Sequence, residues 1–580
     1  MRHTASRKDA ADTLPSARIA ILAAGFFVLS LALSARLAYW QVLRRDELLS
    51  QARAQVVQTE TLSGRRGSIF DRNGRLLATT VQLDSIYAIP KQIPGFADGV
   101  CAGACATAAA SLASAMGDTA DRVRARLQSG AEWLFLKRRV PESVSAKVRA
   151  LGIPGVGLEP EEKRMYPGDR VGAAAVGFVN DDGVGQSGVE ARYDTVLRGT
   201  PGQLVVERDP GNRDLAVGLR ALTPPVDGAD LVLTLDLVMQ SAAERELARV
   251  TAAEKAKSGT IITIDPDTGA ILALASTPGF DPNDVAHSDP EAFRDRAVSW
   301  TYEPGSTMKA ITIAAALNEH AVEPSTTYED KGCAVIGGRT LCNAQGRSYG
   351  RLDISGILEK SANAGAVFVA QRLGADTLYR YLRAFGFGQP TGVDVAGEAA
   401  GTIRPVGEWY PVDLGTAAFG QGLTVTPLQL AAAYAAIANG GTLYRPYLVK
   451  EIRNRDGSVQ RTEPQPIRRV ISPETAATMR QMLTNVIDRG IASAARMPGY
   501  SVAGKTGTAQ IASSDGSYLS DEYVSSFASL MPARDPRFVT LVVLERPQSR
   551  LLGTLSAMSA FTGLAGDLMR YARIEPDRAY

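Results

Sequence analysis

Histidine is nearly absent from this chain of 580 residues, which has three, at His3, His287 and His320. No His-Glu-x-x-His pattern and no cluster of cysteine with histidine occurs, so the sequence does not support a zinc site. A Ser-His-Asp triad is also not favoured, because few histidines are available to act as its base. If the protein activates a serine, lysine is the more available base, and we expect no cofactor.

An excess of charge of one sign is also missing. The chain has 63 lysines and arginines against 61 acidic residues, for a formal net charge of +2, and aromatic residues make up 6%. No basic stripe interleaved with aromatics is present, so we expect no nucleic-acid partner. The 45% hydrophobic and 21% charged content is ordinary for globular domains, and the length suits roughly two to four of them.

Long hydrophobic runs are scarce, and the main one lies near the N-terminus. Ile19–Ala35 carries no charge, and Tyr39 and Trp40 follow at a spacing suited to a membrane interface. We predict a transmembrane anchor over 19–43 behind a basic cytoplasmic tail, 1–18, with the rest of the chain outside. The alternative is a cleaved signal peptide, for which 32–34 offers small residues.

Cysteine is rare, with four residues in two close pairs. If Gly337-Gly338 forms a two-residue hairpin turn, Cys333 and Cys342 face each other as a non-hydrogen-bonded pair. They then form either a disulfide, which fits an oxidising compartment, or two small buried thiols. Cys101 and Cys105 lie in an alanine-rich stretch and are expected to pack as small hydrophobic residues.

Hydrophobic periodicity and turn residues give a coarse outline of the elements. Before residue 228 the pattern predicts a polar helix over 44–60, a hairpin at Asn73-Gly74, helices over 102–150 and an irregular α+β region over 155–225. After residue 228 it predicts a helix over 237–254, a central strand hairpin over 259–265 and 270–275, mostly helices to about 440, strands near Lys505 and over 538–544, a mobile loop over 512–522 and a last helix near 560–572.

Three short motifs carry the chemistry. Ser306-Thr-Met-Lys309 opens an apolar run, and on a helix its serine and lysine share one face. Ser361-Ala-Asn363 and Lys505-Thr-Gly507 follow in that order. Each motif alone has a plain structural explanation: a chance spacing, a helix cap and a turn, respectively. Together, in this order, they predict a serine nucleophile activated by lysine.

With their flanks, these motifs resemble those of the penicillin-interacting serine transferases, most closely class B penicillin-binding proteins. Arg66-Gly67 with Asp71–Gly74 resembles the family's N-terminal signature, and Arg164–Pro167 through Gly188–Glu190 its pedestal. The resemblance implies a mixed α+β fold. It consists of the N-terminal transmembrane helix, an elongated α+β pedestal over 44–227, and a serine β-lactamase-like transpeptidase domain over 228–580, in which helices flank an antiparallel sheet.

The resemblance implies catalytic roles for Ser306, Lys309, Ser361 and Asn363. Ser306 would attack a D-Ala-D-Ala stem peptide to form an acyl-enzyme, and a neutral Lys309 would take its proton. Ser361 would relay a proton to the leaving amine, while Asn363 holds Lys309 and the substrate amide.

The third motif is implied to bind substrate. Lys505 would bind the substrate carboxylate, and Thr506 and Thr508 would supply hydroxyl contacts. Gly507 would leave room for substrate beside the strand. The backbone N–H groups of Ser306 and Thr508 would form the oxyanion hole.

One competing motif overlaps the third. Residues 499–506 fit the P-loop pattern G-x-x-x-x-G-K-[ST], and 541–545 resemble a Walker B strand. A P-loop must follow a buried strand and lead into a helix. Here Pro498 precedes the motif and a polar loop follows it, so we reject a nucleotide-binding function.

No acidic glycan-polymerase signature occurs in 44–227, which favours a monofunctional transpeptidase. Ser85–Lys91 and the compact pedestal resemble those of the division-specific type more than those of the elongation-specific type. The resemblance implies a single-pass protein of the bacterial inner membrane with its catalytic domain in the periplasm. It also implies peptidoglycan stem peptides and nascent glycan strands as substrates, β-lactam antibiotics as inhibitors, and a SEDS-type membrane glycan polymerase and divisome proteins as partners. The alternatives are an elongation-type transpeptidase, a D,D-carboxypeptidase, or a non-enzymatic β-lactam sensor or divisome scaffold.

Overall fold

The computed structural model describes residues 16–48, 57–207, 220–513, 517–548 and 553–578. His3 and most of the tail predicted over 1–18 lie outside the described residues. The chain divides into two units, the first formed by residues up to 64 with 200–226, and the second by 65–199 with 227–580.

The first unit contains the apolar helix and a small sheet. Helix α1 (Ser16–Ala38) continues into a π-helical turn, η1 (Tyr39–Leu43), and 18–43 is long and apolar enough to cross a membrane. A separate antiparallel sheet has the order β1-β8-β9, formed by Val57–Leu62, Gly202–Glu207 and Arg220–Thr223. The helix predicted over 44–60 is therefore wrong in its last residues, which form β1.

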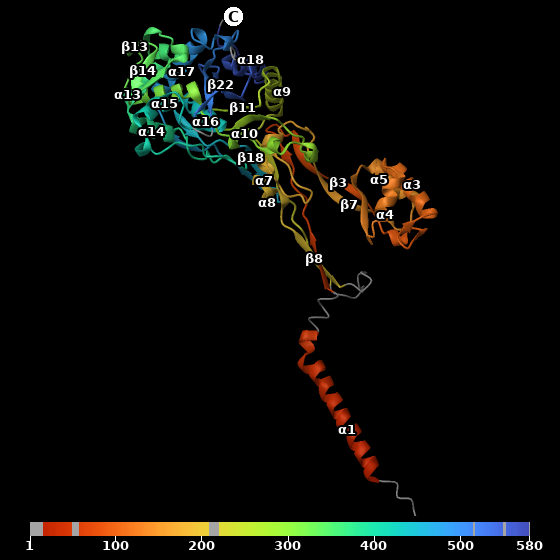
Figure 1. Ribbon diagram of the computed structural model, residues 1–580. Coiled ribbons are helices and arrows are strands. Elements are labelled where there is room, and N and C mark those ends of the chain that lie inside the picture. Colours follow the sequence, from red (N-terminus) through yellow and green to blue (C-terminus); the bar gives the residue numbers. More distant parts are fainter. Residues whose placement is uncertain (1–15, 49–56, 208–219, 514–516, 549–552, 579–580) are drawn as a thin grey trace, which may run out of the picture. The chain divides into compact units, whose positions relative to one another are not determined.

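The second unit begins with a mixed sheet of order β19-β18-β10-β2-β3-β6, in which β7 also pairs with β3. β2 and β3 pair antiparallel across Asn73-Gly74, which confirms the predicted hairpin. β3 and β7 continue as a long ribbon to the helices α3 to α5 (Figure 1). The strands are β2 (Ile69–Phe70), β3 (Leu76–Ala88), β6 (Leu134–Val140), β7 (Val156–Met165), β10 (Asp230–Leu233), β18 (Val449–Arg453) and β19 (Val459–Arg461).

Two predictions fail in the region around α3. The stretch 102–150 is not all helix, because β6 lies between α4 and α5 and pairs with β3. Cys101 and Cys105 are not free thiols but form a disulfide, with Cα atoms 5.1 Å apart. Gly103, at φ +55°, ends the extended segment before α3, so Cys101 lies off the helix and within bonding reach of Cys105. The helices are α3 (Ala104–Met116), α4 (Ala120–Leu127) and α5 (Glu142–Leu151).

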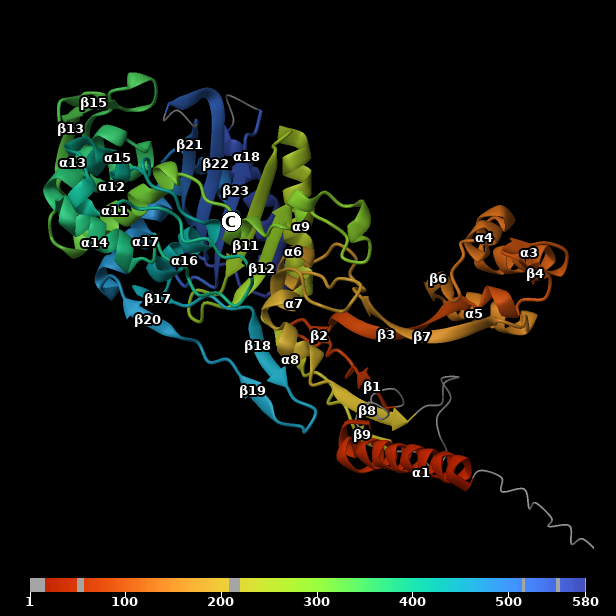
Figure 2. The same ribbon diagram turned by 60° about the horizontal axis from the view of Figure 1, so that its bottom comes forward.

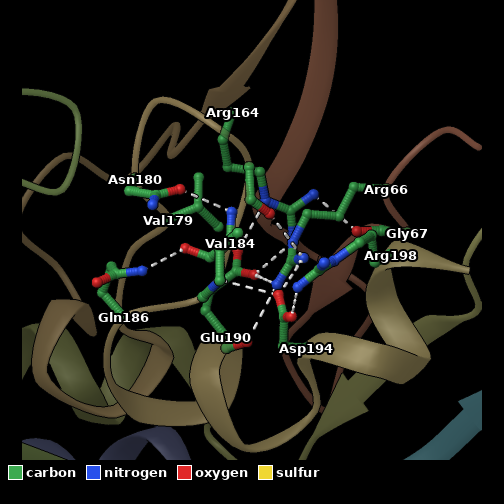
Figure 3. A network of polar contacts seen from close by, with 12 residues as sticks. Arg66, Gly67, Arg164, Val179, Asn180, Val184, Gln186, Glu190, Asp194 and Arg198 are labelled. Atoms are coloured by element: carbon green, nitrogen blue, oxygen red, sulfur yellow. Dashed lines mark hydrogen bonds and ion pairs between the residues drawn. The ribbon is translucent and has the colours of Figure 1, made fainter. Parts of the chain in front are cut away.

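A buried ion-pair network joins the strands of this region to two short helices, α7 (Gly188–Arg192) and α8 (Asp194–Arg198) (Figure 3). Arg66 lies 2.6 Å from the Glu190 carboxylate and 2.7 Å from Asp194. Arg164 contacts the other Glu190 oxygen at 2.7 Å. The N-terminal signature and the pedestal region thus meet in one network. We call its members, Arg66, Arg164, Glu190 and Asp194, the pedestal cluster.

The sheet near the site has five strands in the part of the chain that the structure describes, in the order β12-β11-β23-β22-β21. Helices α9 and α18 cover one face and α16 lies against the other (Figure 2). The elements are α9 (Leu237–Glu254), β11 (Ser258–Ile264), β12 (Ile271–Thr277), α16 (Pro427–Ala438), β21 (Ala503–Ala512), β22 (Tyr518–Met531), β23 (Phe538–Glu545) and α18 (Gly553–Tyr571). β22 is missing from the sequence-based outline. It occupies much of the loop predicted over 512–522, of which residues 514–516 lie outside the described residues.

The predicted β11–β12 hairpin is confirmed, but its central position is wrong for β12, which lies at the sheet edge. Helix α9 covers this edge. The Gln240 side-chain amide donates to the Leu274 carbonyl at 2.8 Å, and its oxygen accepts from the Leu274 N–H at 2.7 Å. Gln240 thus pairs with the two backbone groups of Leu274 at this edge of the sheet.

Beyond the sheet lies a helical layer with α11 at its centre, where residues 308–317 are all buried. The predicted hairpin over 333–342 is present, and its two cysteines pair as a disulfide. The helices are α11 (Met308–Asn318), α12 (Ile354–Lys360), α13 (Asn363–Leu373), α14 (Ala375–Ala384), α15 (Pro411–Ala418) and α17 (Pro473–Asp488), and the hairpin strands are β14 (Cys333–Ile336) and β15 (Arg339–Cys342). Short elements are β4 (Phe96–Ala97), β5 (Val100–Cys101), α6 (Ala173–Val176), α10 (Arg296–Ser299), β13 (Thr327–Asp330), β16 (Gly350–Asp353), β17 (Thr442–Tyr444) and β20 (Pro466–Arg469).

Candidate active site

Ser306 lies in a 3-10 turn, η5 (Gly305–Thr307), that leads directly into α11. Gly305 has φ +57°, and its N–H donates to the Gly420 carbonyl at 3.0 Å. A Cβ on Gly420 would lie 2.3 Å from the Gly305 oxygen, so the two backbones meet closely because both residues are glycine. This packing fixes the turn that holds the half-buried serine.

Lys309 is the centre of the site. Its Nζ lies 3.1 Å from Ser306 Oγ, 2.7 Å from Asn363 Oδ1 and 2.6 Å from the backbone oxygen of Ser361. Ser361 takes the left-handed conformation, φ +55°, at the end of α12, and Asn363 begins α13. This break between two helices directs one carbonyl and one amide oxygen to the same amine.

Lys505 approaches from the other side, on the edge strand β21. Its Nζ lies 2.9 Å from Ser361 Oγ, which is itself 3.2 Å from Lys309 Nζ. The Ser361 hydroxyl therefore lies between two amines. The structure brings together residues from three motifs that are far apart in the sequence.

Both lysine side chains are fully buried, at 0% exposure. Among the residues that the structure describes, their amines contact hydroxyl, amide and backbone oxygens and no carboxylate. Burial, reinforced by the charge of Lys505, holds the pKa of Lys309 well below its usual range. Burial alone lowers the pKa of Lys505 to about 7. A buried amine without a carboxylate is poised to be neutral, which a general base requires.

The residues after Lys505 continue along β21. Thr506 is buried at 1% exposure, whereas Thr508 is exposed. A Cβ on Gly507 would lie 2.4 Å from Ser526 Oγ and 2.9 Å from the Pro304 oxygen. The structure thus gives this glycine a packing reason, which is the close approach of β21 to the turn before Ser306, and the clearance for substrate stays a prediction.

Two contacts at the site were not predicted from the sequence. The Glu303 carboxylate accepts hydrogen bonds from the Gly422 N–H at 2.9 Å and from the Tyr518 hydroxyl at 3.1 Å, and burial raises its pKa. The Asn363 amide nitrogen donates to the Cys342 carbonyl at 2.9 Å. The motif flanks did contain Glu303, but its partner Tyr518 lies on β22, which the sequence-based outline missed.

The fold excludes the P-loop. Residues 503–512 form strand β21, so Lys505 lies inside a strand rather than ahead of a helix. The Walker B-like Glu545 has a structural role, because its carboxylate binds Lys257 and Arg296, each at 3.0 Å.

Comparisons with known proteins agree with this geometry. The family model of the penicillin binding protein transpeptidase domain matches residues 259–563, and that of the penicillin-binding protein dimerisation domain matches 61–233. The chain is 32% identical to the peptidoglycan D,D-transpeptidase FtsI of Escherichia coli K12, over 97% of this chain and 92% of that protein. It is 33% identical to the stage V sporulation protein D of Bacillus subtilis, over 94% of this chain and 83% of that protein.

Among solved structures, penicillin binding protein 3 of Mycobacterium tuberculosis in complex with aztreonam matches with a TM-score of 0.70 and 29% identity, covering 90% of this chain and 98% of that one. The matches span both the pedestal and the catalytic sheet. The chain belongs to the class B penicillin-binding proteins, with the transpeptidase fold preceded by the dimerisation domain.

Proposed function

We propose that this protein is a peptidoglycan D,D-transpeptidase that crosslinks stem peptides through an acyl-enzyme on Ser306 in septal wall synthesis, and that β-lactams acylate the same serine. The observation that carries the proposal is the buried Lys309 amine, 3.1 Å from the Ser306 hydroxyl and without a carboxylate contact in the part of the chain that the structure describes. The matches to named peptidoglycan D,D-transpeptidases support it.

The contacts of Lys309 fit a neutral amine. Such an amine has two N–H donors and one lone pair. The Ser361 backbone oxygen and Asn363 Oδ1, at 2.6 and 2.7 Å, accept hydrogen bonds and cannot donate them, so they take both donors. The lone pair is then free to accept the proton of the Ser306 hydroxyl.

The reaction proceeds in two halves. Ser306 Oγ forms a bond to the carbonyl carbon of the penultimate D-alanine while Lys309 takes its proton. The C–N bond to the terminal D-alanine breaks, and the proton on Lys309 passes through the Ser361 hydroxyl to the leaving amine. An amine of a second stem peptide then attacks the acyl carbon and forms the crosslink; the ester bond to Ser306 Oγ breaks, and the proton lost by the amine returns to that oxygen through Lys309.

We assign the substrate contacts to β21. Lys505 attracts the terminal carboxylate, and the exposed Thr508 offers a hydroxyl at the edge of the sheet. Thr506 and Gly507 set the path of that strand. The backbone N–H groups of Ser306 and Thr508 stabilise the oxyanion.

We further propose that the helix over 19–43 anchors the protein in the inner membrane, with 1–18 in the cytoplasm and the pedestal (44–227) and transpeptidase domain (228–580) in the periplasm. Its length, apolar composition and exposed side chains support a membrane-spanning role. A membrane glycan polymerase of the SEDS type and divisome proteins would be its partners.

The test uses the full chain in detergent with a fluorescent penicillin. We expect stoichiometric labelling of the wild type and none of Ser306→Ala. Labelling that persists in this variant would remove Ser306 as the nucleophile. Incubation with a donor pentapeptide and an amine acceptor then identifies the second half-reaction: a crosslinked product supports the transpeptidase, whereas hydrolysis alone indicates a carboxypeptidase.

A further inference from the structure

Asn363 connects the catalytic lysine to the disulfide-linked hairpin. Its Oδ1 lies 2.7 Å from Lys309 Nζ, and its Nδ2 donates to the Cys342 carbonyl at 2.9 Å. A side-chain amide carries its acceptor and its donors at opposite ends. The Cys342 carbonyl therefore selects the orientation that presents oxygen to Lys309.

The end of β15 is held against α13 at a second point. Asn343 is 4% exposed, and its Oδ1 accepts from the Ala364 N–H at 2.9 Å. Its amide nitrogen donates to the Asp330 carboxylate at 2.8 Å. Residues 342 and 343 thus contact residues 363 and 364 directly, so a shift of β15 would move the Asn363 side chain.

The disulfide adds a covalent tie to a short hairpin that backbone pairing and the packing of Ile336 and Leu341 also hold. The two strands have four residues each, paired from Cys333–Cys342 to Ile336–Arg339 around the turn at 337–338. A two-stranded hairpin this short is marginal by itself. The covalent tie joins the strands at Cys342, the residue whose carbonyl receives the Asn363 amide.

We propose that the Cys333–Cys342 disulfide is a positioning element for acylation, which holds the Cys342 carbonyl so that Asn363 keeps its oxygen on Lys309. This inference rests on the proposed function, because it concerns the same serine and lysine. The disulfide itself does not touch the substrate.

The chain contains its own control. The second disulfide, Cys101–Cys105, ties β5 to α3, and both of its cysteines are buried. In the hairpin, by contrast, Cys342 is exposed and Cys333 half-buried, so a soluble dithiol reaches that bond more readily. If loss of any disulfide slowed acylation through a general loss of stability, removing either pair would have this effect. If the disulfide positions Lys309, only removal of Cys333–Cys342 should slow it.

The experiment compares the full-length wild type, C333S/C342S and C101S/C105S, each in detergent. The first-order rate constant of acylation by fluorescent penicillin and the final labelled fraction are measured separately, before and after treatment with dithiothreitol and desalting. We expect C333S/C342S to acylate about three- to tenfold more slowly, the effect of one lost hydrogen bond, and to reach the wild-type end point. Dithiothreitol should slow the wild type and C101S/C105S similarly and leave C333S/C342S unchanged.

The two measured quantities separate positioning from folding. A partly unfolded sample labels at the wild-type rate but to a lower end point, and that result for C333S/C342S would overturn the inference. A wild-type rate with a full end point would overturn it as well. If the double variant does not fold, the dithiol treatment of the folded wild type decides the matter, and an unchanged rate after verified reduction rejects the inference. Absence of labelling in the untreated wild type would instead reject the proposed function.

Discussion

The pedestal cluster and the active site both bury charged side chains in the second unit, but they surround them with opposite kinds of partner. In the pedestal cluster every buried arginine meets a carboxylate: Glu190, at 0% exposure, contacts both Arg66 and Arg164. At the active site two buried lysines share one hydroxyl, that of Ser361. The first arrangement pairs opposite charges, and the second lowers the pKa of both amines.

The difference shows how a buried ionisable group can be assigned a role from its partners. Paired charges hold distant segments together, as β7 and α7 are held by Arg164 and Glu190 (Figure 3). An unpaired amine beside a hydroxyl is costly for stability and useful for proton transfer. We therefore expect substitutions in the pedestal cluster to alter stability and those at the active site to alter rate.

The largest expected effect is that of Lys309→Met. Methionine fills a similar volume but cannot take the Ser306 proton, so the acylation rate constant should fall by about 10²- to 10⁴-fold. The free energy of unfolding should stay equal or rise, because a buried amine is removed. Stopped-flow acylation and chemical denaturation measure the two quantities, and a variant that loses stability without losing rate would contradict the assignment.

The converse test is Glu190→Gln in the pedestal cluster. It leaves two buried arginines short of a partner and should lower the free energy of unfolding by about 3 kcal/mol. The molecules that remain folded should acylate at the wild-type rate. Loss of rate at a full end point would show that the cluster acts on the active site as well.

The dependence of stability on pH is the third test. Lys505 has a folded pKa of about 7, below the ordinary value of 10.5, so the folded state binds fewer protons than the unfolded state between these pH values. Its penalty on folding is therefore full below pH 7 and is relieved as pH rises toward 10.5. Between pH 7 and 9 we expect the wild type to gain on the order of 2 kcal/mol relative to Lys505→Met.

Chemical denaturation at a series of pH values gives the free energy of unfolding as a function of pH, and its slope is compared between variants. Lys91→Met is the matched control, because the Lys91 side chain is 71% exposed. The control should keep the wild-type slope. If the free energy of unfolding rises equally with pH in Lys505→Met and the wild type, Lys505 stays charged in the folded protein over this range.

The smallest expected effect is a shift in the pH profile of acylation. The charge of Lys505 lowers the pKa of Lys309, so Lys505→Met should raise that pKa and move the acid limb of the rate profile to higher pH. The rate is measured at saturating penicillin, so that weaker binding does not interfere. Lys505→Arg keeps the charge, and its limb should stay near the wild-type position. A limb that does not move in Lys505→Met would assign the low pKa to burial alone.

Local patterns predicted much of the fold. The hairpins at Asn73-Gly74 and over 333–342 follow from turn residues, and α9 follows from its periodicity. β22 was missed because its sequence is polar. Ser525, Ser526 and Ser529 are nearly fully buried in it, and Ser529 donates to the Thr540 carbonyl at 3.0 Å. Such a strand is stabilised by its neighbours in the sheet, which a single-segment pattern does not contain.

At the site, too, local patterns were predictable from the sequence and contacts between distant segments were not. The order and spacing of its motifs predicted which residues to inspect, because each motif lies within a few residues of sequence. The contacts of Asn363 with Cys342 and of Glu303 with Tyr518 join segments 21 and 215 residues apart. They depend on how helices and strands pack, so the sequence alone did not indicate them.

The most direct test of the central claim is to locate the acyl group left by a substrate. The full chain is incubated with a donor peptide ending in D-Ala-D-Ala, quenched, digested and examined by mass spectrometry. We predict that the peptide containing Ser306 carries the donor less one D-alanine, and that Lys309→Met shows this adduct at a small fraction of the wild-type level. An adduct on another residue, or an equal yield in Lys309→Met, would contradict an acyl-enzyme formed on Ser306 with Lys309 as its base.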